Sequence, residues 1–217
     1  MSVNIQCQGD SRSNLLRSPP SFPEAFALRL DHIIQQFKHE FVYCESRSEA
    51  SVTPDQIETE HFQELIRTKK VAEIELMIKN GFDLKRRDVE SWASIHWATE
   101  MGDERLVVLF LDKDPLMLNM KTKEGLSPIN IAAWQGNKKM VDLLLKQGAE
   151  VEDRTKWGEV PLHHAVTFNH VAVCEVLLSA GADPFAEDNL KRSPYMLAMR
   201  KGSTKMKKLF SKFAPKE

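Results

Sequence analysis

The chain has 217 residues, of which 42% are hydrophobic and 28% are charged, and its formal net charge at pH 7 is −1. The apolar content is sufficient for a buried core, whereas the near-zero charge gives the whole chain no attraction to nucleic acid or to an anionic membrane. The three cysteines, Cys7, Cys44 and Cys174, are widely scattered and lack metal-ligand spacing, so they indicate neither a disulfide framework nor a zinc site.

The first 20 residues are polar and rich in Ser, Arg and Pro, and we expect them to be disordered because they carry little apolar surface to bury. They lack the continuous apolar stretch of a signal peptide, and no run in the chain reaches the roughly 18 apolar residues of a membrane span. We therefore expect an intracellular protein of the cytoplasm, the nucleus or both.

Residues 21–43 are predicted to form one amphipathic helix. Ser21 and Glu24 have the spacing of a capping box, and apolar residues follow at helical intervals: Phe26, Leu30, Ile33, Ile34, Phe37 and Phe41. This apolar stripe either caps the structure that follows or binds a groove of a partner, and the sequence leaves both alternatives open. Residues 44–53 are polar and are predicted to be a linker.

From residue 54 the sequence repeats with a period of about 33 residues. VPLHHA at 160–165 matches SPINIA at 127–132, ASIHWA at 93–98 and SPYMLA at 193–198. The residues that end the second helix of successive copies are 33, 34 and 33 positions apart: Gly81, Asp114, Gly148 and Gly181. Each copy predicts a short helix, a tight turn and a longer helix with one apolar face, and the copies must stack because none could bury that face alone.

This period and the PLHHA motif resemble the ankyrin repeat, most closely in residues 154–187, which keep Gly158, Pro161, Leu162, His163, Ala165 and Gly181 of the family's pattern. The resemblance implies an all-α solenoid of helix-turn-helix units joined by hairpin loops. The repeats are expected at about 54–87, 88–121, 122–153, 154–187 and 188–213, with the outer two degenerate. Ser91 and Lys191 stand where the hairpin glycine belongs, and we expect them to distort their turns because positive φ is costlier for them than for Gly.

The resemblance also gives a structural role to two histidines. His96 and His163 occupy the position from which, in similar proteins, the imidazole hydrogen-bonds backbone between neighbouring repeats. Cys174 lies within an apolar helix and is predicted to be a core residue. No Ser-His-Asp arrangement, metal-ligand cluster or glycine-rich phosphate loop emerges, so we expect no catalysis, no cofactor and no small-molecule substrate.

Surface recognition remains as the predicted activity. In proteins with such repeats, the hairpin tips and the exposed end of the inner helix line a concave groove. The corresponding positions predict these partner-binding residues: Trp92, Glu100, Met101, Lys123, Glu124, Leu126, Trp134, Gln135, Lys156, Trp157, Glu159, Phe168, Leu190 and Arg192. Three of the four tryptophans fall in this set, and Trp is a common hot-spot residue of interfaces. The alternative is that each indole packs along its own hairpin.

The last part of the chain is basic, with Arg200, Lys201, Lys205, Lys207, Lys208, Lys212 and Lys216. This run could bind an acidic partner, phospholipid headgroups or nuclear import machinery, or remain solvated. The predicted function is a monomeric, non-catalytic scaffold, adaptor or inhibitor that binds a protein through the concave groove. The alternative is a nuclear regulatory protein that contacts transcription or nucleic-acid machinery with help from the basic C-terminal helix, although direct nucleic-acid binding is not expected.

Overall fold

The computed structural model describes residues 54–213. These residues form helices joined by turns and loops, and they contain no strand. The predicted N-terminal tail, the amphipathic helix at 21–43 and the linker at 44–53 lie outside the described residues. The α-helices are α2 (Pro54–Arg67), α3 (Val71–Lys79), α4 (Ser94–Glu100), α5 (Glu104–Lys113), α6 (Pro128–Gln135), α7 (Lys138–Lys146), α8 (Pro161–Thr167), α9 (Val171–Ser179), α10 (Pro194–Lys201) and α11 (Thr204–Phe210). Two 3-10 helices complete the set, η1 (Pro115–Asn119) and η2 (Ser211–Phe213).

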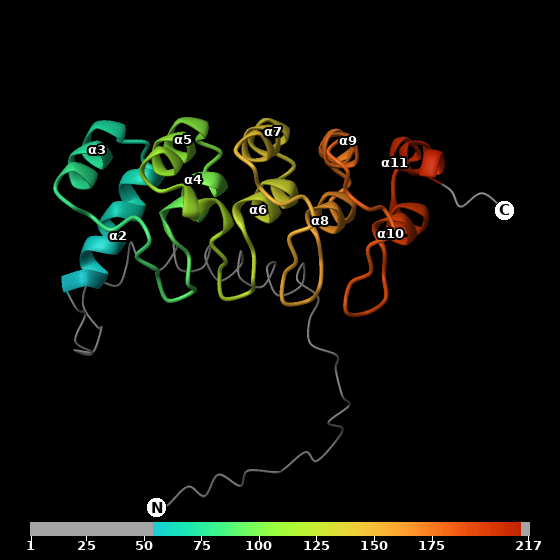
Figure 1. Ribbon diagram of the computed structural model, residues 1–217, viewed down its shortest axis with the longest axis horizontal. Coiled ribbons are helices and arrows are strands. Elements are labelled where there is room, and N and C mark those ends of the chain that lie inside the picture. Colours follow the sequence, from blue (N-terminus) through green and yellow to red (C-terminus); the bar gives the residue numbers. More distant parts are fainter. Residues whose placement is uncertain (1–53, 214–217) are drawn as a thin grey trace, which may run out of the picture. The chain divides into compact units, whose positions relative to one another are not determined.

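The helices form five antiparallel pairs that stand side by side in one row (Figure 1). The first helix of each pair lies in an inner layer, where α2, α4, α6, α8 and α10 pack one against the next. The second helix of each pair packs on its own partner and lies in an outer layer, α3, α5, α7, α9 and α11. This is the all-α repeat solenoid that the sequence predicts. No helix within residues 54–213 is both long enough and apolar enough to cross a membrane.

Local signals in the sequence start the helices where they are observed. Proline occupies the first turn of α6, α8 and α10, where the missing N–H has no intrahelical partner to lose. Asp103 caps α5, because its carboxylate accepts from the backbone N–H groups of Arg105 and Leu106, and the Asn137 side chain caps α7 in the same way. The apolar residues along one side of each outer helix fill a continuous core between the two layers. Six of them are fully buried: Leu106, Phe110, Met140, Leu144, Val173 and Leu177.

The two repeat-motif histidines join neighbouring repeats, as predicted. His96 Nδ1 accepts a hydrogen bond from the Ala93 N–H at 3.0 Å, and its Nε2 lies 2.8 Å from the carbonyl oxygen of Met120, directly before the boundary with the next repeat. His163 repeats this pattern with Val160 at 3.1 Å and Arg192 at 3.0 Å. In the repeat between them, Asn130 takes the histidine position and donates to the Asp153 carbonyl at 3.3 Å.

The expected distortion of the Ser91 and Lys191 turns is wrong. Ser91 (φ 61°) and Lys191 (φ 59°) adopt the same left-handed backbone as Gly125 and Gly158, and all four residues donate to the carbonyl three positions earlier at 2.9 to 3.0 Å. The residue that opens each turn differs between the two classes. Asp88 and Asp188 precede the non-glycine residues and accept two backbone N–H groups each at 2.8 to 2.9 Å, whereas a threonine opens both glycine turns. Two charge-assisted hydrogen bonds offset the cost of positive φ.

Candidate functional site

The predicted partner-binding residues divide into three groups by exposure. Four are exposed to solvent: Lys123, Lys156, Phe168 and Leu190. Seven are half-buried: Glu100, Met101, Glu124, Trp134, Gln135, Trp157 and Arg192. Three are buried: Trp92, Leu126 and Glu159. The first two groups lie on the hairpins and on the C-terminal ends of the inner helices or the residues directly after them, and together we call this surface the inner face.

The buried group corrects the prediction that Trp92, Leu126 and Glu159 are open to a partner. All three directly follow the left-handed residue of a hairpin, and all three side chains are buried. Trp92 is 2% exposed and packs on Trp97 with ring centroids 5.0 Å apart. Glu159 has the same relation to His164, five residues later, at 3.9 Å. In two of the three cases, the residue five positions later in the inner helix lies beside the buried side chain.

The hairpin tips are held in register by backbone hydrogen bonds between repeats. Lys123 N–H donates to the Glu90 carbonyl at 3.1 Å, Lys156 N–H to Glu124 at 3.0 Å, and Asn189 N–H to Trp157 at 2.9 Å. This ladder places the tips in one row. Its exposed side chains include Val89 and Leu190 near the two ends, 83% and 62% exposed, with Lys123 and Lys156 between them.

A second row lies at the opposite ends of the inner helices, and its centre is aromatic. Trp134 in the last turn of α6 meets Phe168 after α8 edge to face, with ring centroids 5.7 Å apart. Phe168 stacks in turn on His170 at 6.2 Å, and His170 Nε2 lies 2.9 Å from the Trp134 carbonyl oxygen. We call Trp134, Phe168 and His170 the aromatic cluster. Phe168 is 38% exposed, so the cluster presents an aromatic ring to solvent.

Glycine is required beneath this cluster. Gly136 ends α6 with φ 74°, and a Cβ placed there would come within 2.4 Å of the His170 ring. Sequence reasoning did not identify His170. The sequence does contain a signal for this contact. His170 follows the turn between α8 and α9, and Gly136 lies in the equivalent turn of the preceding repeat.

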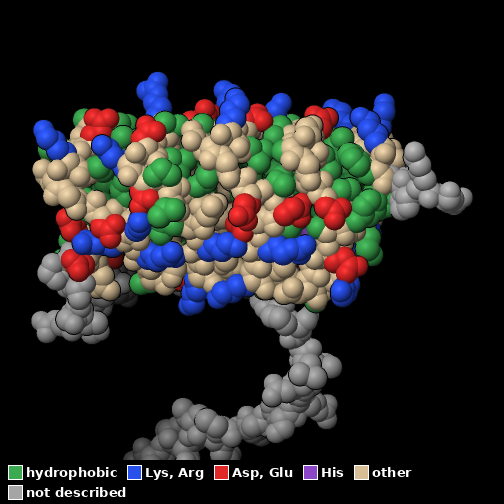
Figure 2. All heavy atoms as spheres, viewed as in Figure 1, with side chains coloured by type: hydrophobic (Ala, Val, Ile, Leu, Met, Phe, Trp, Pro, Cys, Tyr) green, Lys and Arg blue, Asp and Glu red, His purple; other side chains and the backbone are tan. Residues whose placement is uncertain are grey.

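Sequence reasoning also missed a row of basic side chains that link repeats. Arg87 donates to the carbonyl of Lys121, Lys121 Nζ to the carbonyl of Arg154 at 3.0 Å, and Arg154 Nη1 to the carbonyl of Glu187 at 2.8 Å. Figure 2 shows a row of Lys and Arg side chains across one face of the array, with a row of Asp and Glu above it. The signal was the spacing of these basic residues, 34 and 33 positions, which equals the repeat period.

Arg192 of the inner face is half-buried and lies beside two buried carboxylates. Arg192 bridges Glu159 at 3.3 Å and Asp188 at 2.6 Å. Burial raises the pKa of Glu159 to about 7, against the opposing attraction of Arg192. Burial also lowers the pKa of His164 to about 3. His164 is therefore neutral at pH 7, and the 3.9 Å contact with Glu159 is not an ion pair at that pH.

Burial sets the protonation states of His96 and Cys174. Burial lowers the pKa of His96 to about 4 and raises the pKa of the Cys174 thiol to about 12, so the first is neutral and the second protonated at pH 7. Within the described part of the chain, no group of three or more His, Cys, Asp and Glu side chains is arranged to hold a metal ion. The chemistry available on the inner face is hydrogen bonding, aromatic contact and charge.

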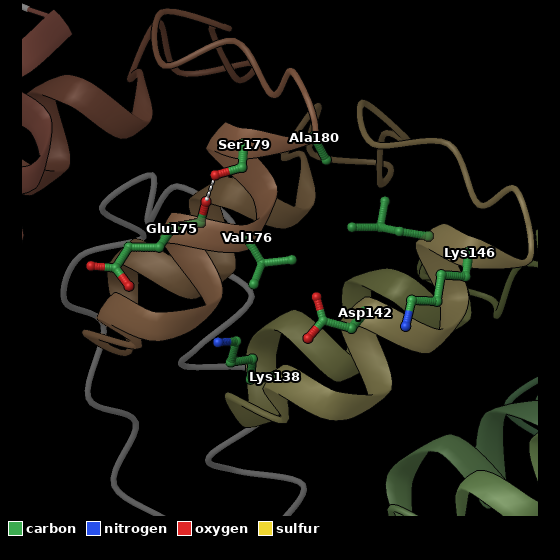
Figure 3. Close-up of a pocket in the computed structure, with 8 residues that line it drawn as sticks. Lys138, Asp142, Lys146, Glu175, Val176, Ser179 and Ala180 are labelled. Atoms are coloured by element: carbon green, nitrogen blue, oxygen red, sulfur yellow. Dashed lines mark hydrogen bonds between the residues drawn. The ribbon is translucent and has the colours of Figure 1, made fainter.

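An open depression lies on the outer layer, away from the inner face. It is lined by Lys138, Asp142 and Lys146 of α7 and by Glu175, Val176 and Ser179 of α9 (Figure 3). The Ser179 hydroxyl donates to the Glu175 carbonyl at 2.7 Å, which ties it to its own helix. Most of the lining side chains are exposed and of mixed charge, so the depression offers no enclosed site for a ligand.

A family model described as ankyrin repeats matches residues 66–155 and 95–188, which together span more than half of the chain. An ankyrin repeat and LEM domain-containing protein of Caenorhabditis elegans is 44% identical over 28% of the chain and 8% of its own length. The human transient receptor potential cation channel subfamily A member 1 is 22% identical over 66% of the chain and 14% of its own length. The ADP-ribosylation factor GTPase-activating protein AGD4 of Arabidopsis thaliana is 23% identical over 93% of the chain and 27% of its own length. The chain thus spans less than a third of each of these relatives.

Proposed function

The chain belongs to the ankyrin-repeat family, and from this premise we propose that it is a non-catalytic protein-binding module, acting as a scaffold, adaptor or inhibitor. The partner binds the inner face, where the hairpin tips form one row and the aromatic cluster the other. Because the repeats fix the spacing of both rows, the surface is preorganised and binding loses little conformational entropy.

One observation carries the proposal, namely the exposed edge of the aromatic cluster. Aromatic side chains are the commonest anchors of interfaces, since they bury a large area at a small cost in side-chain entropy. Phe168 is 38% exposed, and its ring is already fixed between Trp134 and His170. A partner that covers it gains apolar contact without having to order it.

The relatives differ in activity, so they support a role in protein binding more than they support any particular enzymatic reaction. They include a cation channel, a GTPase-activating protein and a LEM domain-containing protein, and they share with this chain only a small part of their length. A segment common to proteins of such different activity fits a recognition role. We place the protein in the cytoplasm, the nucleus or both, and we propose that it is monomeric when no partner is bound.

The proposal is tested by quantitative capture of binding proteins from cell extract with the full chain. The test variant is Trp134→Ala with Phe168→Ala. The control variant is Leu76→Ala with Leu116→Ala, which removes two exposed leucines that lie outside the inner face, 57% and 75% exposed. A partner of the inner face is lost with the test variant and kept with the control. A set of proteins that both variants retain equally would contradict the proposal.

A further inference from the structure

The C-terminal end of the array carries an unusual charge distribution. Residues 189–213 contain eight Lys and Arg side chains and no Asp or Glu. Two of the eight are ion-paired to the preceding acids, Lys191 with Glu187 and Arg192 with Asp188. The other six form no ion pair with any carboxylate of the described residues, and we call them the basic end: Arg200, Lys201, Lys205, Lys207, Lys208 and Lys212.

The fold holds these cations at the surface. Arg200 and Lys201 occupy the last turn of α10, three lysines lie on α11, and Lys212 lies in η2. All six side chains are exposed, whereas Met206 and Phe210 on the other side of α11 are fully buried against the array. Figure 2 shows Lys and Arg side chains gathered above the end of the array where α11 lies. Because the apolar residues Met206 and Phe210 are buried against the array, the exposed side of α11 carries mainly its three lysines.

Several cations elsewhere in the array are neutralised by carboxylates of the array itself. Lys85 pairs with Asp114, Arg86 with Glu58 and Lys121 with Asp153. The six cations of α10, α11 and η2 that lack an ion pair in the described chain repel one another, and the repulsion falls when an anionic surface approaches. Unpaired lysines also occur on other outer helices, such as Lys139 and Lys146 of α7, but α7 carries Asp142 as well, whereas residues 189–213 contain no carboxylate side chain. The basic end therefore has a stronger electrostatic reason to bind a polyanion.

The kind of cation favours one class of polyanion. Five of the six are lysines, which act as mobile, strongly hydrated point charges, whereas bidentate recognition of a particular carboxylate or phosphate favours arginine. Many weak, non-directional contacts suit a surface of repeated charges. Met196 of α10 and Phe213 of η2 are also exposed, so apolar side chains accompany these charges.

We propose that the basic end binds a membrane surface of anionic phospholipid headgroups, as a peripheral and electrostatic contact. The four lysines of α11 and η2 lie outside the inner face, whereas Arg200 and Lys201 in the last turn of α10 continue its second row. Membrane contact through the four lysines leaves the aromatic cluster and the hairpin tips free for a protein partner. It would deliver a partner held on the inner face to a membrane.

The test is co-sedimentation of the full chain with vesicles of phosphatidylcholine alone and with vesicles of equal parts phosphatidylcholine and phosphatidylserine. The test variant replaces four cations of the basic end, Lys205→Gln, Lys207→Gln, Lys208→Gln and Lys212→Gln. The control changes the net charge equally on the outer helices, with Lys79→Gln, Lys113→Gln, Lys139→Gln and Lys146→Gln, all of them exposed and without ion pairs in the described chain. Duplex DNA and polyglutamate serve as competing polyanions.

At about 0.1 M salt, where the screening length is about 10 Å, we expect binding to the anionic vesicles only, and at about 1 M, where it is about 3 Å, we expect none. The test variant should bind at least about tenfold more weakly, and the control should bind like the wild type. Absence of binding to anionic vesicles at the lower salt, or equal loss in both variants, would overturn the proposal. Stronger binding to DNA or to polyglutamate than to the vesicles would also overturn it, in favour of nucleic acid or an acidic protein.

Discussion

The Trp134 indole and the Phe168 ring meet edge to face across the boundary between two repeats, with their centroids 5.7 Å apart. They come from sequence positions 34 residues apart, and the period brings them together because the inner-helix end of one repeat lies beside that of the next. His170 completes the arrangement by bonding to the Trp134 carbonyl. The aromatic cluster is therefore a product of stacking, and its stability depends on the glycine beneath it.

Gly136→Ala should destabilise the protein more than a typical helix-end glycine substitution. The left-handed backbone alone costs Ala about 1 kcal/mol, and the clash of the new Cβ with His170 raises the total to at least ~2 kcal/mol. Gly148→Ala is the matched control, since Gly148 also has positive φ (92°) but has nothing within 4 Å of an added Cβ. Urea denaturation of both variants measures the difference. Equal destabilisation would mean that the His170 contact contributes nothing.

Ser91→Gly should stabilise the protein by about 1 kcal/mol, because glycine adopts the left-handed backbone of this turn without strain. The Asp88 bonds that hold the turn go to other backbone groups and remain. Lys156→Gly is the control at a hairpin tip that lacks positive φ, and it should be destabilising by a few tenths to about 1 kcal/mol. The free energies of unfolding of the two variants should therefore change in opposite directions.

Histidine burial predicts that the protein loses stability in acid. Burial lowers the pKa of His96 to about 4 and that of His164 to about 3, and it also lowers the pKa of His163. Below pH 6.5 these imidazoles become protonated in the unfolded chain but stay neutral in the native protein. The free energy of unfolding therefore falls as the pH decreases, by up to about 1.4 kcal/mol per pH unit for each group. His96→Asn, which copies Asn130 of the next repeat, should show a shallower loss between pH 6.5 and 4. An unchanged slope would exclude His96 as a cause.

Glu159 has the opposite effect. Because burial raises its pKa to about 7 from 4.5, the native protein holds a proton there that the unfolded chain releases, and stability falls as the pH rises from 4.5 to 7. Glu159→Gln should gain roughly 2 kcal/mol relative to the wild type between pH 5 and pH 8. Glu175→Gln, at an exposed site, should follow the wild type across the same range. A constant difference between Glu159→Gln and the wild type at both pH values would contradict the burial effect.

The repeat period made most of the fold predictable. The spacing of 33 or 34 residues, the PLHHA-like helix starts and the apolar stripes are enough to place the helix pairs and the roles of His96 and His163. The Ser91 and Lys191 turns were predicted wrongly because the aspartates that open them were not considered. Their carboxylates accept hydrogen bonds that stabilise the turn, so the turn keeps its usual geometry although Ser91 or Lys191 has a positive φ.

The site was less predictable, because exposure depends on pairs of side chains. Trp92 and Trp134 both matched groove positions, yet Trp92 is buried on Trp97 while Trp134 lies half-buried beside Phe168. The two residues hold different positions in the repeat. Trp92 follows the left-handed residue of a hairpin, a position that is also buried at Leu126 and Glu159, whereas Trp134 lies in the last turn of an inner helix. Both positions were predicted to be exposed. The inter-repeat row of Arg87, Lys121 and Arg154 was not predicted either.

The central claim is that a protein partner covers the aromatic cluster, and the most direct measurement is the affinity of a captured partner for Trp134→Ala, Phe168→Ala and Leu116→Ala, each with its melting temperature. At an interface hot spot we expect each aromatic truncation to cost at least ~2 kcal/mol of binding, about a 30-fold weaker Kd, and Leu116→Ala to leave the Kd unchanged. The melting temperature of Phe168→Ala should stay close to that of the wild type, because its ring is partly exposed. Wild-type affinity in both aromatic variants, or equal weakening by Leu116→Ala, would contradict the claim.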